Sequence, residues 1–288
     1  MNLSPQSWQA IVREAASRAV GEDVGPLDVT SRLVVPALAR AVATLVSRES
    51  CVLAGLDVAE AVFREVDGSL RWSTACRDGQ VIQAGTVVAE VRGSARAILT
   101  GERCALNFLQ RLSGVATKTA EYVNAVAGTT TKILDTRKTT PGLRALERQA
   151  VRSGGGTNHR AGLYGGVLVK ENHQVFMADG VWEETIKKAR EEYPDLSLVV
   201  EADNVELAVK LLSQPIDRVL LDNMSNEEVS RVVALRKKMG SRVEMEASGG
   251  VTVVRARELA TLGVDWVSVG GLTHSARAID FSLDLIPE

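Results

Sequence analysis

The chain has few cysteines and no long apolar run, and each scarcity excludes a class of protein. Its three cysteines, Cys51, Cys76 and Cys104, are an odd number without zinc-type spacing. We therefore expect neither a disulfide framework nor a zinc site, and we predict a reducing, cytoplasmic location. No apolar stretch approaches the length of a membrane span, and residues 1–15 lack a basic region followed by an apolar one, so we expect no membrane partner. The formal net charge of −2 gives no indication of a nucleic acid partner.

What is present is the composition of a globular protein with a real core. The chain has 288 residues, of which 45% are hydrophobic and 24% are charged. This length suits one large α/β domain or two smaller ones.

The second half of the chain repeats short apolar, β-branched runs that each end in a polar residue or glycine. The runs cover residues 132–135, 167–170, 198–201, 218–222, 243–246 and 266–271. Amphipathic helices are expected between several of them, at 205–213, 225–240 and 252–263. Ser225 and Glu228 form a capping box at the start of the second helix, and Gly263 ends the third. This alternation predicts parallel βα units, arranged as a barrel or as a doubly wound sheet.

The residues that end these runs favour the barrel. The runs finish at residues with chemical or conformational roles, namely Asp135, Lys170, Glu201, Asp222, Glu246 and Gly270. In a βα-barrel the carboxyl ends of the strands converge on one mouth, whereas in an open sheet they spread along an edge. We predict an α/β fold with an incomplete βα-barrel of about six to seven parallel strands, formed by residues 116–272.

The first 115 residues follow a different pattern and predict an N-terminal α+β domain with antiparallel strands. A helix is expected at about 5–20, and a turn at 78–80 separates two strand-like stretches. A further helix is expected at 100–112, capped by Thr100 and ended by Gly114. The C-terminal tail, residues 273–288, is expected to pack with this domain.

Residues 154–160 read GGGTNHR, and a run of three glycines costs backbone entropy. The segment fits a mobile surface loop, or a loop that brings Asn158, His159 and Arg160 to a ligand. It lies in a locally basic stretch, because residues 132–170 hold eight Lys and Arg but only two acids. Such a cluster fits a small, multiply charged anion. Arg144, Arg148 and Arg152, spaced by four, could instead be a solvated helix face.

Four cations are expected at the mouth of the barrel. They are Arg137, Lys138, Arg160 and Lys170. Arginine binds carboxylate or phosphate through paired hydrogen bonds, and lysine adds a mobile charge. Glu201 and Asp222 end two consecutive strands, where they are either salt-bridge partners or oxygen ligands of Mg²⁺. Ser248, Gly249 and Gly250 precede a helix whose first amides could bind phosphate.

Several long motifs then resemble one family. They are LNFLQRLSGVAT at 106–117, LDTRKTTPGLRALERQAVRSGGGTNHRAGL at 134–163, VLVKENH at 167–173, LLDNM at 220–224, EASGG at 246–250 and LTHSA at 272–276. Their sequence and order are similar to quinolinate phosphoribosyltransferases, also called nicotinate-nucleotide pyrophosphorylases (carboxylating). The resemblance runs nearly end to end.

The resemblance implies a reaction and a role for each motif. Quinolinate and phosphoribosyl pyrophosphate would give nicotinate mononucleotide, CO₂ and pyrophosphate, in the biosynthesis of NAD. The residues implied to bind quinolinate are Arg137, His159, Arg160 and Lys170, together with Arg103, which a homodimer would donate across its interface. Those implied to serve phosphoribosyl pyrophosphate and Mg²⁺ are Lys138, Glu201, Asp222, Ser248, Gly249, Gly250 and Gly270. Among them, Lys138, Glu201 and Asp222 are implied to be catalytic, and the two acids are implied to be metal ligands.

Two other readings of the sequence stay open. One is a related phosphoribosyltransferase that acts on another small acid, although such a substrate would not need the full set of four quinolinate-binding groups. The other is a phosphate-binding protein without activity, against which the presence of Glu201 and Asp222 argues.

Overall fold

The computed structural model describes residues 4–177 and 181–288. Its chain divides into two compact units. The first comprises the described residues of Met1–Ala120, Thr139–Gly155 and Leu272–Glu288, and the second comprises those of Glu121–Lys138 and Gly156–Gly271. The segment 139–155, which the sequence assigned to the barrel, thus groups with the first unit.

The first unit is an α+β arrangement around an antiparallel sheet. Its helices and strands are α1 (Pro5–Val24), α2 (Val29–Val34), β1 (Arg40–Ser47), β2 (Cys51–Val52), α3 (Leu56–Val66), β3 (Arg71–Ser73), β4 (Val81–Ile82), β5 (Val87–Ser94), α4 (Ala95–Ala125, whose last turn belongs to the second unit), α5 (Arg144–Ser153), α11 (Gly271–His274) and β12 (Phe281–Pro287). The sheet order is β12-β1-β5-β3, and β2 pairs separately with β4. The C-terminal strand β12 therefore pairs with β1, from Ala41 opposite Pro287 to Ser47 opposite Phe281.

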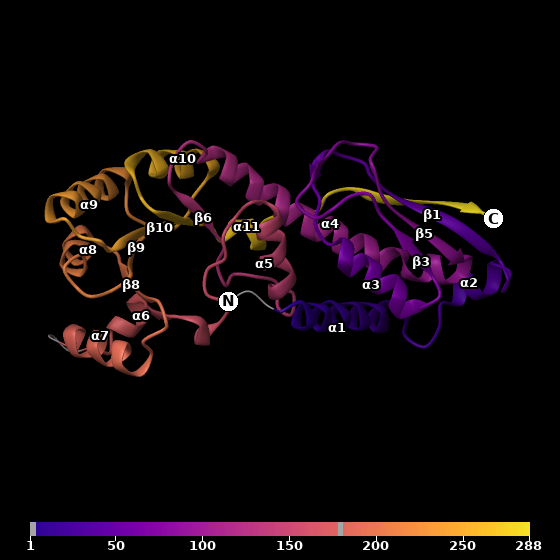
Figure 1. Ribbon diagram of the computed structural model, residues 1–288, viewed down its shortest axis with the longest axis horizontal. Coiled ribbons are helices and arrows are strands. Elements are labelled where there is room, and N and C mark those ends of the chain that lie inside the picture. Colours follow the sequence, from indigo (N-terminus) through magenta and orange to yellow (C-terminus); the bar gives the residue numbers. More distant parts are fainter. Residues whose placement is uncertain (1–3, 178–180) are drawn as a thin grey trace. The chain divides into compact units, whose positions relative to one another are not determined.

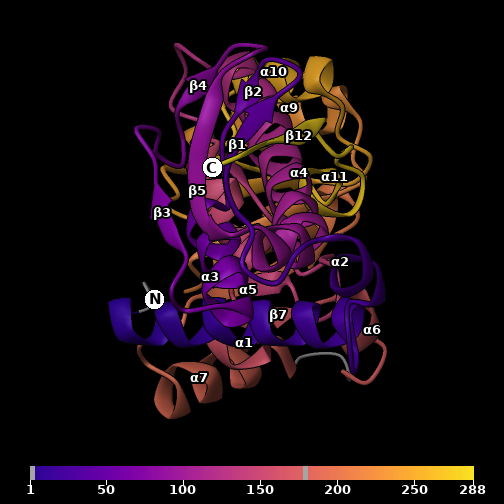
Figure 2. The ribbon, with the colours of Figure 1, turned by 90° about the vertical axis from the view of Figure 1, so that its right-hand side faces the viewer.

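The core of this unit follows from the alternation along its strands and helices. Ala41, Ala43 and Leu45 of β1 are fully buried, as are Phe63 of α3 and Leu109 of α4. Helix α1 lies along α3, as Figures 1 and 2 both show. Side chains that alternate on a strand and repeat every three or four residues on a helix thereby meet in one apolar layer.

Helix α4 is longer than the sequence predicted. It runs through Gly114 to Ala125, so the expected end at Gly114 was wrong. A side chain at Gly114 would collide with the carbonyl oxygen of Arg277. This glycine is therefore needed for close packing against the C-terminal segment, and it does not end the helix.

The second unit contains the predicted parallel strands. Its elements are β6 (Lys132–Leu134), the 3₁₀ turn η1 (Leu163–Gly165), β7 (Val167–Val169), α6 (Glu171–Gln174), α7 (Val181–Glu192), β8 (Leu198–Ala202), α8 (Val205–Leu211), β9 (Arg218–Asp222), α9 (Asn226–Met239), β10 (Glu244–Ser248), α10 (Val253–Leu262) and β11 (Trp266–Ser268). The helix caps behave as the sequence indicated. Ser225 and Glu228 form the capping box of α9, and Gly263 ends α10 in a left-handed conformation.

The strand order shows that this unit is an incomplete barrel. The six strands lie in the order β6-β11-β10-β9-β8-β7, so the first strand pairs with the last, as in a closed barrel. Within the described residues, β6 and β7 do not pair, and the sheet stays open along this seam. Helices α8, α9 and α10 lie on its outer face (Figure 1). No helix in the described part of the chain is long and apolar enough to cross a membrane.

Candidate active site

The carboxyl edge of the parallel sheet collects the polar residues predicted from the sequence. Asp222 and Ser248 are register partners at the ends of β9 and β10, and Glu201 pairs with Leu220 near the end of β8. Lys170 directly follows β7. Since all six strands are parallel, these positions share the edge on which active sites of barrel-type sheets lie.

The GGGTNHR segment is tied to β6. Thr157 bridges Leu134, and the buried carboxylate of Asp135 accepts hydrogen bonds from Asn158 Nδ2 (2.6 Å) and from the His159 backbone N–H (2.7 Å). The segment is therefore an ordered loop whose position is set by a buried acid.

Two of the three glycines have visible reasons to be glycine. Gly154 caps α5, and a side chain there would collide with the carbonyl oxygen of Ala116 on α4. Gly155 has a φ of +83°, which is strained for other residues. The observed uses of these two glycines are therefore close packing against α4 and a positive-φ turn ahead of the loop.

His159 lies at the inner end of this loop, with a side chain that is only 12% exposed. Its Nδ1 accepts the Arg160 backbone N–H at 2.7 Å, and its Nε2 lies 3.4 Å from Oε2 of Glu246. Arg218 Nη1 donates to the same oxygen at 2.9 Å. Burial alone raises the pKa of the Glu246 carboxyl, but His159 and Arg218 outweigh it and hold that pKa below its ordinary value.

Arg160 and Arg137 bring two guanidinium groups together near the end of β6. Partial burial lowers the pKa of Arg160, and the positive charge of Arg137 lowers it further. Arg160 Nη1 also donates to the carbonyl of Gly166 at 2.9 Å, which holds the side chain across the seam between β6 and β7. Two neighbouring cations in a partly desolvated site gain most from a ligand with more than one negative charge.

A cavity of about 180 Å³ runs along this seam. It is lined by His159, Arg160 and Gly166 on the loop side, and it reaches Arg218 and Trp266 inside the sheet. The three side chains that the sequence singled out in GGGTNHR, those of Asn158, His159 and Arg160, therefore line the same hollow.

Glu201 and Asp222 have partners within the protein. Lys170 Nζ lies 3.3 Å from Glu201 Oε2, and the backbone N–H of Glu171 donates to Oε1 at 3.3 Å. Asp222 accepts a hydrogen bond from Asn223 Nδ2 at 2.7 Å. The sequence left open whether these two acids form salt bridges. Glu201 forms one with Lys170, whereas the hydrogen bond described for Asp222 is to a neutral amide.

The loop after β10 has the backbone of an anion-binding turn. Gly249 and Gly250 both have positive φ, and a side chain at Gly249 would collide with Asn223 Oδ1. Thr252 then caps α10 by accepting from the Arg255 N–H. The space around Gly250 is open, so a phosphate oxygen could approach its backbone closely.

Comparison with known proteins places the chain in a family. The model of the quinolinate phosphoribosyl transferase C-terminal domain matches residues 115–284, and the model of the N-terminal domain of the same enzyme matches residues 28–113. The chain belongs to the quinolinate phosphoribosyl transferase family.

Individual relatives match over 90% or more of both chains. The chain is 41% identical to a nicotinate-nucleotide pyrophosphorylase [carboxylating] of Mycobacterium leprae, over 95% of this chain and 96% of the relative. It is 37% identical to a probable enzyme of the same name from Bacillus subtilis, over 92% and 90%. The crystal structure of NadC from Streptococcus pyogenes matches it with a TM-score of 0.91 and 36% identity, covering 100% of this chain and 99% of that one.

Two further residues that the family resemblance assigns to the site, Arg103 and Lys138, are exposed. Arg103 is an exposed residue of α4 in the first unit. Lys138 is exposed at the end of the β6 segment, where its backbone N–H donates to Thr136 Oγ1 at 3.1 Å. Gly270 directly follows β11 at the carboxyl edge. Arg144, Arg148 and Arg152 lie on α5, which belongs to the first unit.

The acids at the carboxyl edge suit one kind of metal site. In the described residues no group of three or more His, Cys, Asp or Glu side chains could hold an ion. Two carboxylates such as those of Glu201 and Asp222 offer the oxygen ligands that Mg²⁺ accepts, since this cation keeps several waters and completes its shell with substrate phosphates. The residues therefore fit Mg²⁺ as a companion of a phosphorylated substrate and do not form a closed cage.

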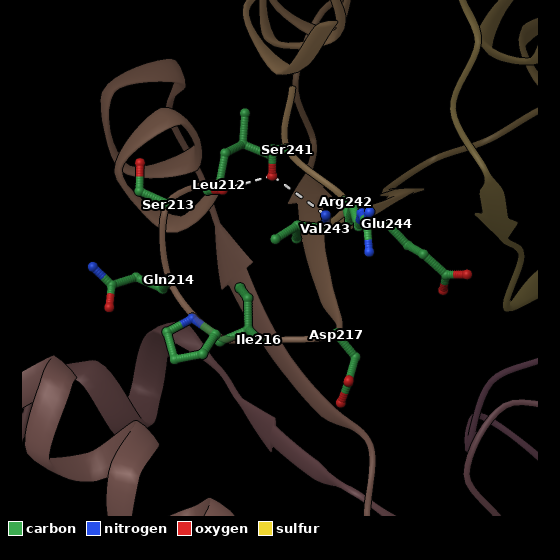
Figure 3. A pocket seen from close by; sticks show the side chains of 10 residues that line it. Leu212, Ser213, Gln214, Ile216, Asp217, Ser241, Arg242, Val243 and Glu244 are labelled. Atoms are coloured by element: carbon green, nitrogen blue, oxygen red, sulfur yellow. Dashed lines mark hydrogen bonds between the residues drawn. The ribbon is translucent and has the colours of Figure 1, made fainter. Parts of the chain in front are cut away.

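A second, larger hollow lies at the amino edge of the sheet. The groove has a volume of about 730 Å³ and is lined by residues 212–217 and 241–244, at the amino ends of β9 and β10 (Figure 3). Ser241 Oγ links its two walls by donating to the Leu212 carbonyl at 2.6 Å. Its lining lacks the clustered cations of the carboxyl edge, so we do not assign the active site to this groove despite its larger volume.

The sequence reading missed the inner partners of the loop. Glu246 was noted only as a strand end, and Arg218 was not singled out, because it begins its strand. The two residues meet because β9 and β10 pair in register, with Leu220 opposite Glu246 and Arg218 opposite Glu244 on the same face. Strand register was the information that the sequence alone did not supply.

Proposed function

We propose that this protein is a quinolinate phosphoribosyltransferase, a pentosyltransferase that converts quinolinate and phosphoribosyl pyrophosphate into nicotinate mononucleotide, CO₂ and pyrophosphate in NAD biosynthesis. The observation that carries the substrate is the Arg137–Arg160 pair beside the cavity that Arg160 lines, where partial burial first and then the charge of Arg137 lower the pKa of Arg160. A pyridine dicarboxylate would offset both charges at once. Family membership over residues 28–284 supports the same reaction.

The chemistry assigns a task to each group. Pyrophosphate leaves the ribosyl carbon, and the pyridine nitrogen forms the new bond to that carbon. The positively charged ring then stabilises the electron pair left when the 2-carboxylate departs as CO₂, and this electron pair takes up a proton from water to give the product. The carboxylates would be oriented by Arg137, His159, Arg160 and Lys170. The phosphates would be held by Lys138 and by the amides of Ser248, Gly249, Gly250 and Gly270. Glu201 and Asp222 would hold Mg²⁺, which supplies positive charge to the departing pyrophosphate.

We further infer a homodimer in which Arg103 enters the neighbouring subunit's site. The support is its place: Arg103 is exposed on α4 in the first unit, whereas the other cations assigned to substrate lie in the second. We also place the protein in the cytoplasm, which agrees with three cysteines that are all free.

One assay tests the function directly. Purified protein with quinolinate, phosphoribosyl pyrophosphate and Mg²⁺ should form nicotinate mononucleotide and pyrophosphate in equal amounts. Arg160→Met should lower kcat/KM for quinolinate by at least about a hundredfold, since a charged hydrogen-bonding pair is lost. Arg231→Met on the exposed face of α9 is the matched control and should be neutral. Absence of product from folded wild-type protein would contradict the proposal.

A further inference from the structure

A line of polar contacts connects the amino end of the sheet to the loop that carries Arg160. Arg218 begins β9 and bonds two acids of β10, with Nη2 3.1 Å from Glu244 Oε2 and Nη1 2.9 Å from Glu246 Oε2. Its guanidinium also lies over the ring of Trp266, at 4.4 Å from the centroid. Glu246 is fully buried and faces His159, which in turn contacts the backbone of Arg160.

The contacts of His159 select one form of its ring. The Arg160 N–H donates to Nδ1, so Nδ1 carries no proton. The proton therefore sits on Nε2, where it points to the Glu246 carboxylate. The opposite tautomer would set an N–H against the Arg160 N–H, and a bare nitrogen against a negative oxygen.

Glu246 is itself held firmly. Oε2 accepts from both Arg218 and His159, and the guanidinium is fixed by Glu244 and by Trp266, whose Nε1 donates to Glu244 Oε2 at 2.7 Å. A buried acid with a cation behind it stays ionised, in agreement with the lowered pKa of its carboxyl. The orientation of the His159 ring is thereby set, through Glu246, by Arg218 at the amino end of the sheet.

We propose that Glu246 is a positioning residue: it fixes His159 as the Nε2–H tautomer, and through Nδ1 it fixes the backbone that aims Arg160 at a substrate carboxylate. The inference rests on the proposed function for the identity of the ligand. This role is additional to the contact with quinolinate that the family resemblance implies for His159.

The first test reads the ring directly and needs no substrate. The chain has three histidines, His159, His173 and His274, so the imidazole nitrogens can be resolved by ¹⁵N NMR and the His159 signals identified by their loss in His159→Gln. We expect a protonated Nε2 and an unprotonated Nδ1 at neutral pH. An Nδ1–H tautomer, or a doubly protonated ring, would overturn the proposal.

The second test uses three substitutions on one strand. Glu246→Met removes the acceptor at similar size, and Glu246→Gln keeps an oxygen that can accept from both neighbours. Glu244→Met is the matched control, because Glu244 bonds Arg218 but not His159. Binding of quinolinate and of phosphoribosyl pyrophosphate is measured separately by calorimetry.

We expect Glu246→Met to lose the Nε2–H signature and to weaken quinolinate binding by about tenfold to a hundredfold, with less than about a twofold change for phosphoribosyl pyrophosphate. Glu246→Gln and Glu244→Met should keep the signature and most of the affinity. An equal loss in Glu244→Met, or wild-type affinity in Glu246→Met, would refute the positioning role. If wild-type protein shows the expected tautomer but binds no quinolinate, the proposed function fails while the tautomer assignment stands.

Discussion

Replacing Glu147 should lower the free energy of unfolding more than replacing any charged residue on the surface of the first unit. Glu147 of α5 is fully buried, and its partner Arg111 of α4 is 26% exposed in its side chain. Arg111 donates to Glu147 Oε1 from Nε (3.1 Å) and Nη2 (2.7 Å), and Thr140 donates to both carboxylate oxygens, at 3.0 Å from its N–H and 2.8 Å from its hydroxyl. This acid therefore holds the 139–143 segment and α4 together.

The magnitude follows from what each substitution leaves behind. Glu147→Met leaves a partly buried guanidinium without its carboxylate and the Thr140 N–H without an acceptor. Arg111 keeps the carbonyls of Ala276 and Thr273 as partners, which places the cost at the lower end of the usual range for a broken buried pair. We expect a loss of about 3 kcal/mol in the free energy of unfolding. Arg111→Met should cost a similar amount, and the double variant should cost less than the sum of the two.

The assay is urea unfolding followed by circular dichroism, with all variants at one protein concentration. Glu60→Met is the matched control, because Glu60 pairs with Arg64 one turn along an exposed face of α3 and should contribute less than about 0.5 kcal/mol. Equal midpoints for Glu147→Met and Glu60→Met would refute the reasoning, and so would strict additivity of the Arg111 and Glu147 substitutions.

Two further predictions concern the site. Asp222→Ala should raise the Mg²⁺ concentration needed for half-maximal activity by at least about tenfold, with a smaller effect for Glu201→Ala. Both variants should leave quinolinate binding largely intact, because the two acids serve the phosphates. Wild-type activity of both variants at limiting Mg²⁺ would show that the acids are structural partners only. Arg103→Ala and Lys170→Ala should each be inactive, yet subunit exchange between them should restore up to about half the activity per mixed dimer, because one of the two shared sites then carries neither defect. Verified mixed dimers without recovered activity would place Arg103 outside the neighbouring site.

The sequence was sufficient for features that depend on local patterns. Short apolar runs, several of them separated by amphipathic helices, predicted the six parallel strands. The capping box of Ser225 and Glu228 marked the start of α9 where the structure has it. Strand ends predicted that Lys170, Glu201 and Asp222 share one edge, because side chains that follow parallel strands must do so.

Features that depend on packing between distant segments could not be predicted. Gly114 has the signature of a helix end, but it lies inside α4. A glycine is needed there because the carbonyl oxygen of Arg277 approaches it closely. The contacts of Glu246 with Arg218 and His159 join three segments, and they form only once the register of β9 and β10 is set. Both cases are close approaches, which leave no periodic trace in the sequence.

The central claim is that the cations around Arg160 are matched to a dicarboxylate. Its most direct test is kcat/KM for quinolinate and for nicotinate, measured with the same protein, phosphoribosyl pyrophosphate and Mg²⁺. Nicotinate lacks one carboxylate and would offset less of the positive charge of the Arg137–Arg160 pair, so quinolinate should be preferred by at least about a thousandfold. Comparable values for the two acids would contradict the account.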